Sequence, residues 1–141
     1  MSNTVLAGQK PGIAANSPAL ILAGRVLLSI LFIIAGFGKL TAISGTAGWF
    51  GSLGIPMPTV VTVVVGLLEL FGGLAILVGF QTRLAAIALA VFTIAASLIA
   101  HLDFADQMQS LLFQKNLSIT GGLLILAAVG AGAFSIDAKR G

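Results

Sequence analysis

The chain has 141 residues, of which 58% are hydrophobic and 8% carry a formal charge. Soluble domains are about half apolar and about a quarter charged, so this composition excludes a soluble globular protein and predicts a single-domain integral membrane protein. The net charge of +3 comes from scattered basic residues, which disfavours nucleic-acid binding, and the lack of cysteine excludes thiol chemistry and thiolate-bound metal clusters on this chain.

Residues 1–17, MSNTVLAGQKPGIAANS, are polar and rich in glycine and alanine. They lack the basic-then-apolar order and the cleavage site of a removable signal peptide. We predict a flexible cytoplasmic tail here, followed by an apolar run that serves as an uncleaved insertion signal.

Four apolar runs follow, each near the ~20 residues that cross ~30 Å of hydrocarbon as a helix. They are Ala19–Gly38, Val60–Phe80, Leu84–Ala100 and Leu117–Phe134. In lipid each run must satisfy its own backbone hydrogen bonds, and none alternates as a barrel strand does. The fold class is therefore an all-α membrane protein, a four-transmembrane-helix bundle over residues 18–137 with a short cytoplasmic tail at residues 138–141.

The three connections differ in character. The first, TAISGTAGWFGSLGIPMP, predicts a short interfacial or re-entrant helix around Thr46–Leu53, with Trp49 at the membrane interface. The second, GFQTR, is short enough to make the second and third spans antiparallel neighbours. The third, HLDFADQMQSLLFQKN, mixes apolar and polar residues and is expected to lie along the outer surface.

The basic residues are distributed unequally between the two sides of such a bundle. The side of the termini would hold Lys10, Arg25, Arg83, Lys139 and Arg140, against Lys39 and Lys115 on the other side. By the positive-inside rule, both termini are predicted to be cytoplasmic.

Two charged residues lie inside the predicted spans. Glu69 is near the bilayer midplane, and Arg25 is about 6 Å away along the membrane normal at ~1.5 Å per residue. An isolated charge at this depth costs at least ~2.5–3.5 kcal/mol, so we predict that Arg25 and Glu69 pair inside the bundle. The pair would either mark a polar site or only fix helix register. Alternatively, Glu69 is protonated in a dry site and is a candidate proton carrier.

Further polar residues lie at the ends of the spans. Lys39, His101 and Lys115 are predicted at the outer face as a polar cluster, although each lysine could instead extend to lipid headgroups. One histidine near Asp103 and Asp106 is a weak metal signal, so no metal site is assigned. At the cytoplasmic face, two residues receive structural or topological roles: Arg83 anchors to lipid phosphate, and Asp137 caps a helix or pairs with Arg83 or Lys139.

Several motifs in order resemble those of the DoxX family, including its YphA-like members. They are the arginine of the first span, GFGK, the Trp-Phe loop ending in LGIPMP, E-x-x-G-G, GFQTR, KN, GG and the terminal FSID, over residues 19–137. The resemblance implies a small four-helix protein of the bacterial inner membrane, in a family named for a subunit of an archaeal thiosulfate:quinone oxidoreductase. It also implies that the polar positions of the family correspond to Arg25, Lys39, Glu69, Arg83 and Lys115, with Asp137 in the terminal motif.

The leading functional hypothesis is an accessory subunit of a membrane redox or oxidative-stress system. It would bind a quinone-like or other amphipathic molecule through Arg25, Lys39, Glu69, Phe32, Phe37 and Phe71. It would not be catalytic alone, would act at most as a quinone-linked oxidoreductase subunit, and would carry no covalent cofactor. Membrane lipid, redox proteins and a second copy of the chain are the expected partners. The alternatives are a small solute or proton transporter or permeability factor, and a structural membrane anchor for a soluble enzyme.

Overall fold

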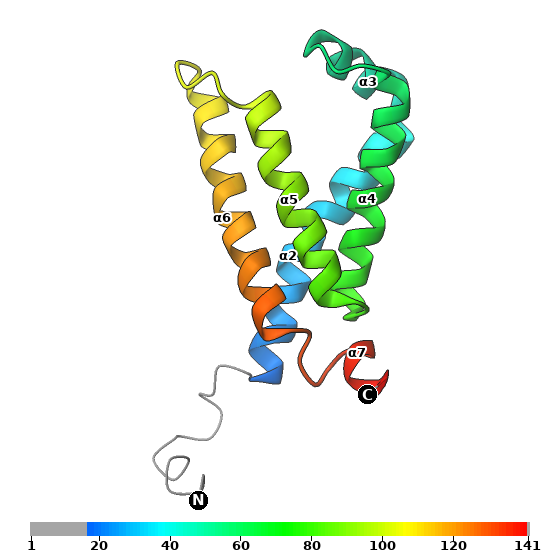
Figure 1. The fold of residues 1–141 in the computed structure, drawn as a ribbon, viewed down its shortest axis with the longest axis vertical. Helices are drawn as coiled ribbons and strands as arrows, with labels where there is room; N and C mark the ends of the chain where they lie inside the picture. The colour runs from blue at the N-terminus through cyan, green and yellow to red at the C-terminus, as the bar shows by residue number, and fades with distance from the viewer. Residues whose placement is uncertain (1–16, 141) are drawn as a thin grey trace, which may run out of the picture.

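The structure is a computed structural model that describes residues 17–140, so all of the predicted tail at residues 1–17 except Ser17 lies outside the described residues. The described chain forms four long helices and two short ones (Figure 1). The long helices are α2 (Pro18–Thr41), α4 (Pro58–Val78), α5 (Thr82–Ala100) and α6 (Gln107–Val129), and the short ones are α3 (Ile43–Ser52) and α7 (Ile136–Arg140).

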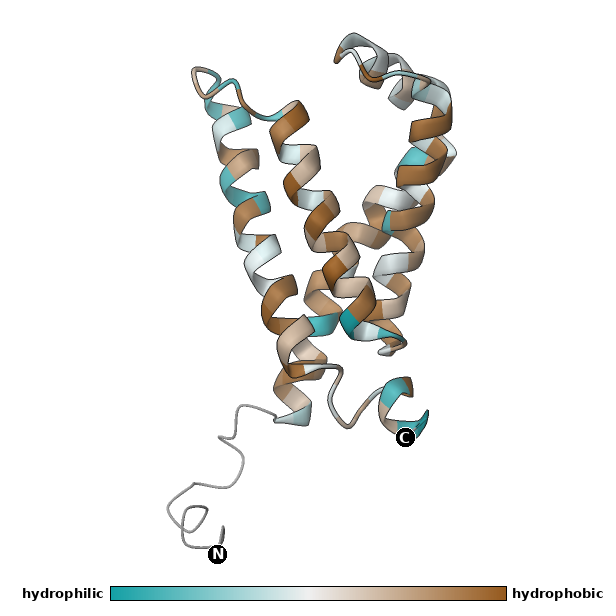
Figure 2. Cartoon of the chain, viewed as in Figure 1, coloured by the Kyte–Doolittle hydropathy of each residue, from teal (hydrophilic) through white to brown (hydrophobic). Residues whose placement is uncertain are grey.

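The four long helices confirm the predicted membrane spans, because each is long and apolar enough to cross a bilayer. Hydrophobic residues run along all four in Figure 2, and many large apolar side chains are exposed on the outside of the bundle, where lipid would cover them. The expected short helix of the first connection is present as α3. Its position at a membrane interface stays a prediction.

The fourth span differs from its predicted bounds. Helix α6 begins at Gln107, ten residues before the expected start at Leu117, and it ends at Val129. At the start, the Asp106 side chain caps the helix by accepting a hydrogen bond from the backbone N–H of Met108. At the end, Gly130 has φ +84°, which terminates the helix. The prediction that the whole third connection lies along the surface was therefore wrong, since its residues from Gln107 onward belong to α6.

The long helices pack mainly as two pairs, α2 with α4 and α5 with α6, which are joined chiefly by contacts between α4 and α5. Figure 1 shows the two pairs diverging toward the end that carries α3. The α2–α4 pair is close because of its glycines. A Cβ added to Gly36 would overlap the backbone N of Leu70 and lie 2.7 Å from the carbonyl oxygen of Gly66.

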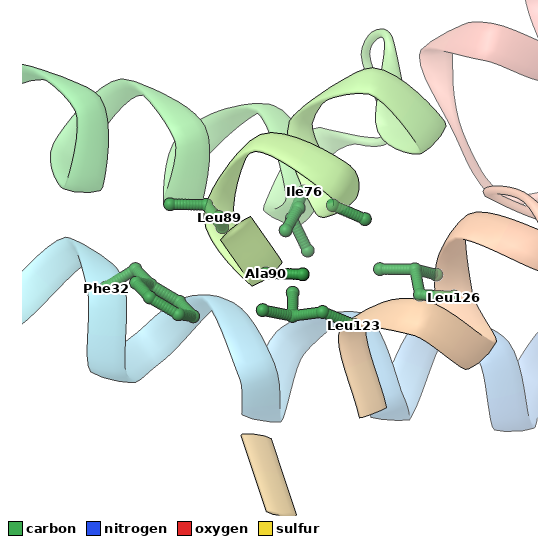
Figure 3. Packing of buried hydrophobic residues seen from close by; sticks show 7 residues of the cluster. Phe32, Ile76, Leu89, Ala90, Leu123 and Leu126 are labelled. Carbon is green, nitrogen blue, oxygen red and sulfur yellow. The ribbon is translucent and has the colours of Figure 1, made fainter. Parts of the chain in front are cut away.

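Most of the buried apolar residues gather in the half of the bundle away from α3. Figure 3 shows the cluster, which comprises Phe32, Ile76, Ala86, Leu89, Ala90, Leu123 and Leu126. These residues come from the late turns of α4 and α6 and the early turns of α5, together with the middle of α2. The half of the bundle that carries α3 contains a pocket instead of this cluster.

Candidate functional site

A pocket of about 390 Å³ lies between the two helix pairs in the half that carries α3. Its walls come from the second half of α2, the first half of α4, the second half of α5 and the middle of α6. Helix α3 and the segment after it contribute Trp49, Phe50, Leu53 and Ile55. Most lining residues are apolar, and a few charged or polar side chains stand among them, as in sites for small molecules.

One wall of this pocket carries a buried ion pair. The Nζ atom of Lys39 lies 2.7 Å from Oε1 of Glu69, with 21% and 7% of the two side chains exposed. The close α2–α4 packing at Gly36 and Gly66 brings the end of α2 beside the middle of α4 and so makes this contact possible. Each charge offsets the desolvation of the other, and both side chains line the pocket.

The opposite wall carries polar side chains from α5 and α6. Asn116 lines the pocket, and its Nδ2 donates a 2.8 Å hydrogen bond to Oγ of Ser97. Thr93 also lines it, with its hydroxyl donating to the carbonyl of Leu89 one turn earlier. His101, directly after α5, has a buried Nδ1 without a hydrogen-bond partner among the described residues. This wall therefore has hydrogen-bonding capacity that the described chain leaves unused.

Aromatic rings complete the lining. Phe32 on α2 and Phe92 on α5 line the pocket, as do Trp49 and Phe50 on α3, whose ring centroids are 5.4 Å apart. Trp49 is the single tryptophan of the chain. Rigid, flat rings of this kind suit a planar apolar ligand.

Arg25 lies in the opposite half of the bundle and does not pair with Glu69. Its side chain, 1% exposed, donates from Nε to the carbonyl of Ile76 (3.0 Å) and from Nη2 to that of Leu77 (2.8 Å). Its Nη1 donates to the carbonyls of Ala131 and Phe134, both at 2.8 Å.

The predicted Arg25–Glu69 pair was therefore wrong, and Lys39 is the partner of Glu69. The physical reason is that the last carbonyls of a helix have no partner within it. A guanidinium, with five N–H donors in a fixed fan, can satisfy several of them together. Arg25 thus ties the end of α4 to the segment after α6.

The predicted ligand-binding residues divide into two groups. Phe32, Lys39 and Glu69 line the pocket, whereas Phe37 and Phe71 are each 60% exposed on the outside of the bundle. The predicted outer polar residues His101 and Lys115 also line it, and so does Trp49. The structure thus brings these six residues together and separates them from Arg25, Phe37 and Phe71.

Sequence reasoning missed the contributions of Phe50, Phe92, Thr93 and Asn116 to the pocket. One signal was available. Thr93 and Ser97 lie four residues apart in an otherwise apolar run, so they share one helix face and mark it as facing inward. Asn116 bonds to that same face.

The end of the molecule near the termini is closed by the C-terminal segment. Oδ1 of Asp137 accepts the backbone N–H of Gln81 (2.7 Å), and Oδ2 accepts that of Thr82 (2.9 Å), which caps α5. Burial works to raise the pKa of Asp137. The hydrogen bonds from Thr82 and Gln81 and the charge of Arg140 outweigh it, so the pKa lies below its ordinary value.

Arg83 lies beside this cap, where it and Asp137 line a second hollow. A Cβ added to Gly130 would lie 3.1 Å from Nε of Arg83, so the arginine side chain packs against the end of α6. Within residues 17–140, no three His, Asp or Glu side chains gather in a way that could hold a metal ion.

Comparison with known proteins identifies relatives along most of the chain. It is 47% identical over 120 residues to the inner membrane protein YqjF of Escherichia coli, covering 83% of this chain and 88% of that protein. It is 34% identical over 131 residues to the inner membrane protein YphA of the same organism, covering 89% and 93%. It is 30% identical over 113 residues to a Bacillus subtilis protein named "Putative oxidoreductase CatD", covering 80% and 81%.

No solved structure matches the chain significantly. The DoxX family model matches residues 20–102, which include α2 to α5 and both members of the Lys39–Glu69 pair. Together with four membrane-spanning helices and relatives named as inner membrane proteins, this match shows that the chain is an integral inner-membrane protein of the DoxX family.

Proposed function

We propose that the pocket binds a quinone-like amphipathic molecule and that the protein serves as an accessory subunit of a membrane redox system. The observation that carries this proposal is a buried ion pair, Lys39–Glu69, facing a cavity whose other walls are mostly apolar and aromatic. A quinone needs a flat apolar slot for its ring and tail and a few polar groups for its carbonyl oxygens. The name of the Bacillus subtilis relative also supports a redox setting.

In this proposal the residues of the chain bind and orient the ligand. The ammonium group of Lys39 donates a hydrogen bond to a quinone oxygen. Glu69, its partner, is the candidate proton carrier: its carboxylate takes up a proton from water and passes it to the reduced quinone oxygen. The aromatic rings of Phe32, Trp49 and Phe92 hold the quinone ring. A partner protein supplies the electrons, since the chain has no cysteine to carry them.

The proposed orientation places the chain termini in the cytoplasm. Arg25, Arg83, Lys139 and Arg140 belong to the end with α7, and Lys39 and Lys115 to the half with α3. This distribution supports a cytoplasmic α7 by the positive-inside rule. The pocket then lies in the outer half of the membrane.

Trp49 provides a direct test, because the chain has no other tryptophan and this one lines the pocket. Decylubiquinone titrated into the detergent-solubilised protein should quench its fluorescence with a saturable curve. Lys39→Met should weaken binding roughly tenfold, because it removes a charged hydrogen-bond donor.

Phe71→Leu is the matched control, since Phe71 is 60% exposed outside the pocket. It should leave the affinity within about twofold of the wild-type value. Quenching that never saturates, and that equals the quenching of a lipophilic tryptophan ester in the same micelles, would contradict quinone binding. The alternatives of a solute or proton pathway, or of an anchor for a soluble enzyme, would then be favoured.

A further inference from the structure

The charged side chains that line the pocket do not all have a partner of opposite charge. Among the described residues that line the pocket, Glu69 is the one with a carboxylate, and it already forms an ion pair with Lys39. Lys115 also lines the pocket, and among the described residues it has no carboxylate within ion-pair distance. The pocket therefore carries one positive charge that the described chain does not balance.

Asn116 and His101 also line the pocket and add hydrogen-bonding capacity. Asn116 uses one N–H of its amide for Ser97, and an amide has a second N–H to offer. The Nδ1 atom of His101 is buried without a partner among residues 17–140. A buried polar atom without a partner is unfavourable unless a ligand or water satisfies it.

The aspartates near this end of the pocket do not supply the missing charge. Asp103 and Asp106 are exposed in the loop that connects α5 to α6, and neither lines the pocket. Asp106 is also engaged in capping α6 through Met108. A bound molecule that carries a negative charge would therefore give Lys115 a partner that the described residues lining the pocket do not supply.

We infer that the His101–Lys115–Asn116 end of the pocket binds an ionised oxygen acid on a lipophilic molecule, such as the ionised hydroxyl of a hydroxyquinone or the carboxylate of a long-chain acid. The inference extends the proposed function. The part of it that concerns hydroxyquinones rests on the proposal that the pocket binds a quinone. Lys115 supplies the charge, and Asn116 and His101 supply hydrogen bonds that orient the acid group. The apolar part of the ligand extends toward the Lys39–Glu69 pair.

A pair of similar quinones separates this specificity from quinone binding in general. Lawsone is a hydroxynaphthoquinone that is ionised at neutral pH, and menadione is a neutral methyl counterpart of similar size. Each is titrated into the full-length protein in lipid-free detergent, with the quenching of Trp49 as the readout. Lawsone should bind roughly tenfold more tightly than menadione, and added salt should reduce that preference.

Lys115→Gln should abolish the preference by lowering the affinity for lawsone. Lys139→Gln is the matched control, because it removes an exposed lysine from α7 at the opposite end of the molecule. Lys115 is itself exposed on α6, so its replacement should not impair folding. Menadione binding as tightly as lawsone, or a lawsone affinity that Lys115→Gln does not change, would overturn the inference even if quinone binding stands.

A second arm does not depend on quinones. Bromododecanoic acid and bromododecanol both quench tryptophan through bromine and differ in the ionised group. Tighter binding of the acid, abolished by Lys115→Gln, would support the inference even if neither quinone bound. Equal binding of acid and alcohol would count against it. Displacement of the acid by phosphatidylglycerol alone, with no effect of lawsone, would show that Lys115 serves a lipid headgroup and would also overturn it.

Discussion

The two ends of this bundle use buried charge in opposite ways. At the end near the termini, the guanidinium of Arg25 donates hydrogen bonds to four backbone carbonyls, and the carboxylate of Asp137 accepts hydrogen bonds from two backbone N–H groups. At the end with α3, Lys39 and Glu69 contact each other beside a pocket, and His101 has a buried nitrogen without a partner within the described chain. The charged groups of the first end are engaged in hydrogen bonds with the backbone, whereas the second end places its charged groups beside a cavity.

This difference separates a structural use of charge from a functional one. Breaking a buried charged network leaves many groups unsatisfied, whereas neutralising both members of an isolated pair leaves few. Substitutions at the two ends should therefore affect stability very differently, although Arg25 and Glu69 both lie within predicted membrane spans.

The largest effect is expected for Arg25→Met. It leaves the carbonyls of Ile76, Leu77, Ala131 and Phe134 without their donor, and we expect a loss of about 3–5 kcal/mol in the free energy of unfolding. Thermal unfolding in detergent, together with the amount of protein in the membrane, would measure it. Arg25→Lys should recover only part of the loss, because an ammonium cannot reach four separated acceptors.

The counterpart at the other end is the double variant Lys39→Met with Glu69→Gln. It removes both charges of the pair, so its unfolding free energy should stay within about 1 kcal/mol of the wild type. If this variant were as unstable as Arg25→Met, the distinction between the two ends would fail.

Gly36→Ala tests how rigidly the α2–α4 pair is held. The added Cβ would overlap the backbone N of Leu70, so we expect a loss on the order of 2–3 kcal/mol from forced separation of the helices. Gly38→Ala, two residues further along α2, is the matched control, because a Cβ there meets nothing within 4 Å. That control should be neutral or slightly stabilising. Equal melting temperatures for the two variants would contradict the close α2–α4 contact.

A smaller effect than that of Gly36→Ala is expected for Asp137→Ala, which removes the cap of α5 and should cost about 1 kcal/mol at neutral pH. The folded-state pKa of Asp137 lies below the ordinary 3.8, so its contribution is present above that pH and is lost as the pH falls through the folded-state pKa. The difference in melting temperature between wild type and variant should therefore shrink on acidification below about pH 4.

Asp103→Ala serves as the control for this pH series, because Asp103 is exposed in the loop between α5 and α6. It should leave the melting temperature nearly unchanged at neutral pH. A difference for Asp137→Ala that stays constant down to acid pH would show that the carboxylate charge is not what stabilises α5.

The number and type of the long helices could be predicted from hydropathy, since about 20 apolar residues per run leave little choice in a bilayer. The bounds of α6 could not be predicted by this means. A hydropathy plot detects only the apolar part of a helix. Helix α6 begins earlier, at the polar Gln107, because Asp106 caps it there. Its end at Val129 is set by Gly130, whose backbone conformation is not visible in a hydropathy plot.

The site could be predicted only in part, for a related reason. The sequence shows which charges must be buried, and it therefore singled out Glu69 and Arg25. It does not show which backbone carbonyls are left free where the helices end, or that those of α4 and of the segment after α6 lie around Arg25. The choice of Lys39 as the partner of Glu69 depends on the α2–α4 register, which is fixed by glycine contacts rather than by depth in the membrane.

Two of the acceptors of Arg25, the carbonyls of Ala131 and Phe134, belong to the last stretch of the chain, and Asp137 reaches back to α5 from the same stretch. During synthesis, α2 with Arg25 therefore enters the bilayer long before the ribosome has made Ala131 and Phe134, whose carbonyls accept hydrogen bonds from Arg25. Closure of that end must wait for residues 131–137. A stop codon directly after α6 would leave four inserted helices without the carbonyls of Ala131 and Phe134 and without the carboxylate of Asp137, so such a truncation would be a defect of assembly.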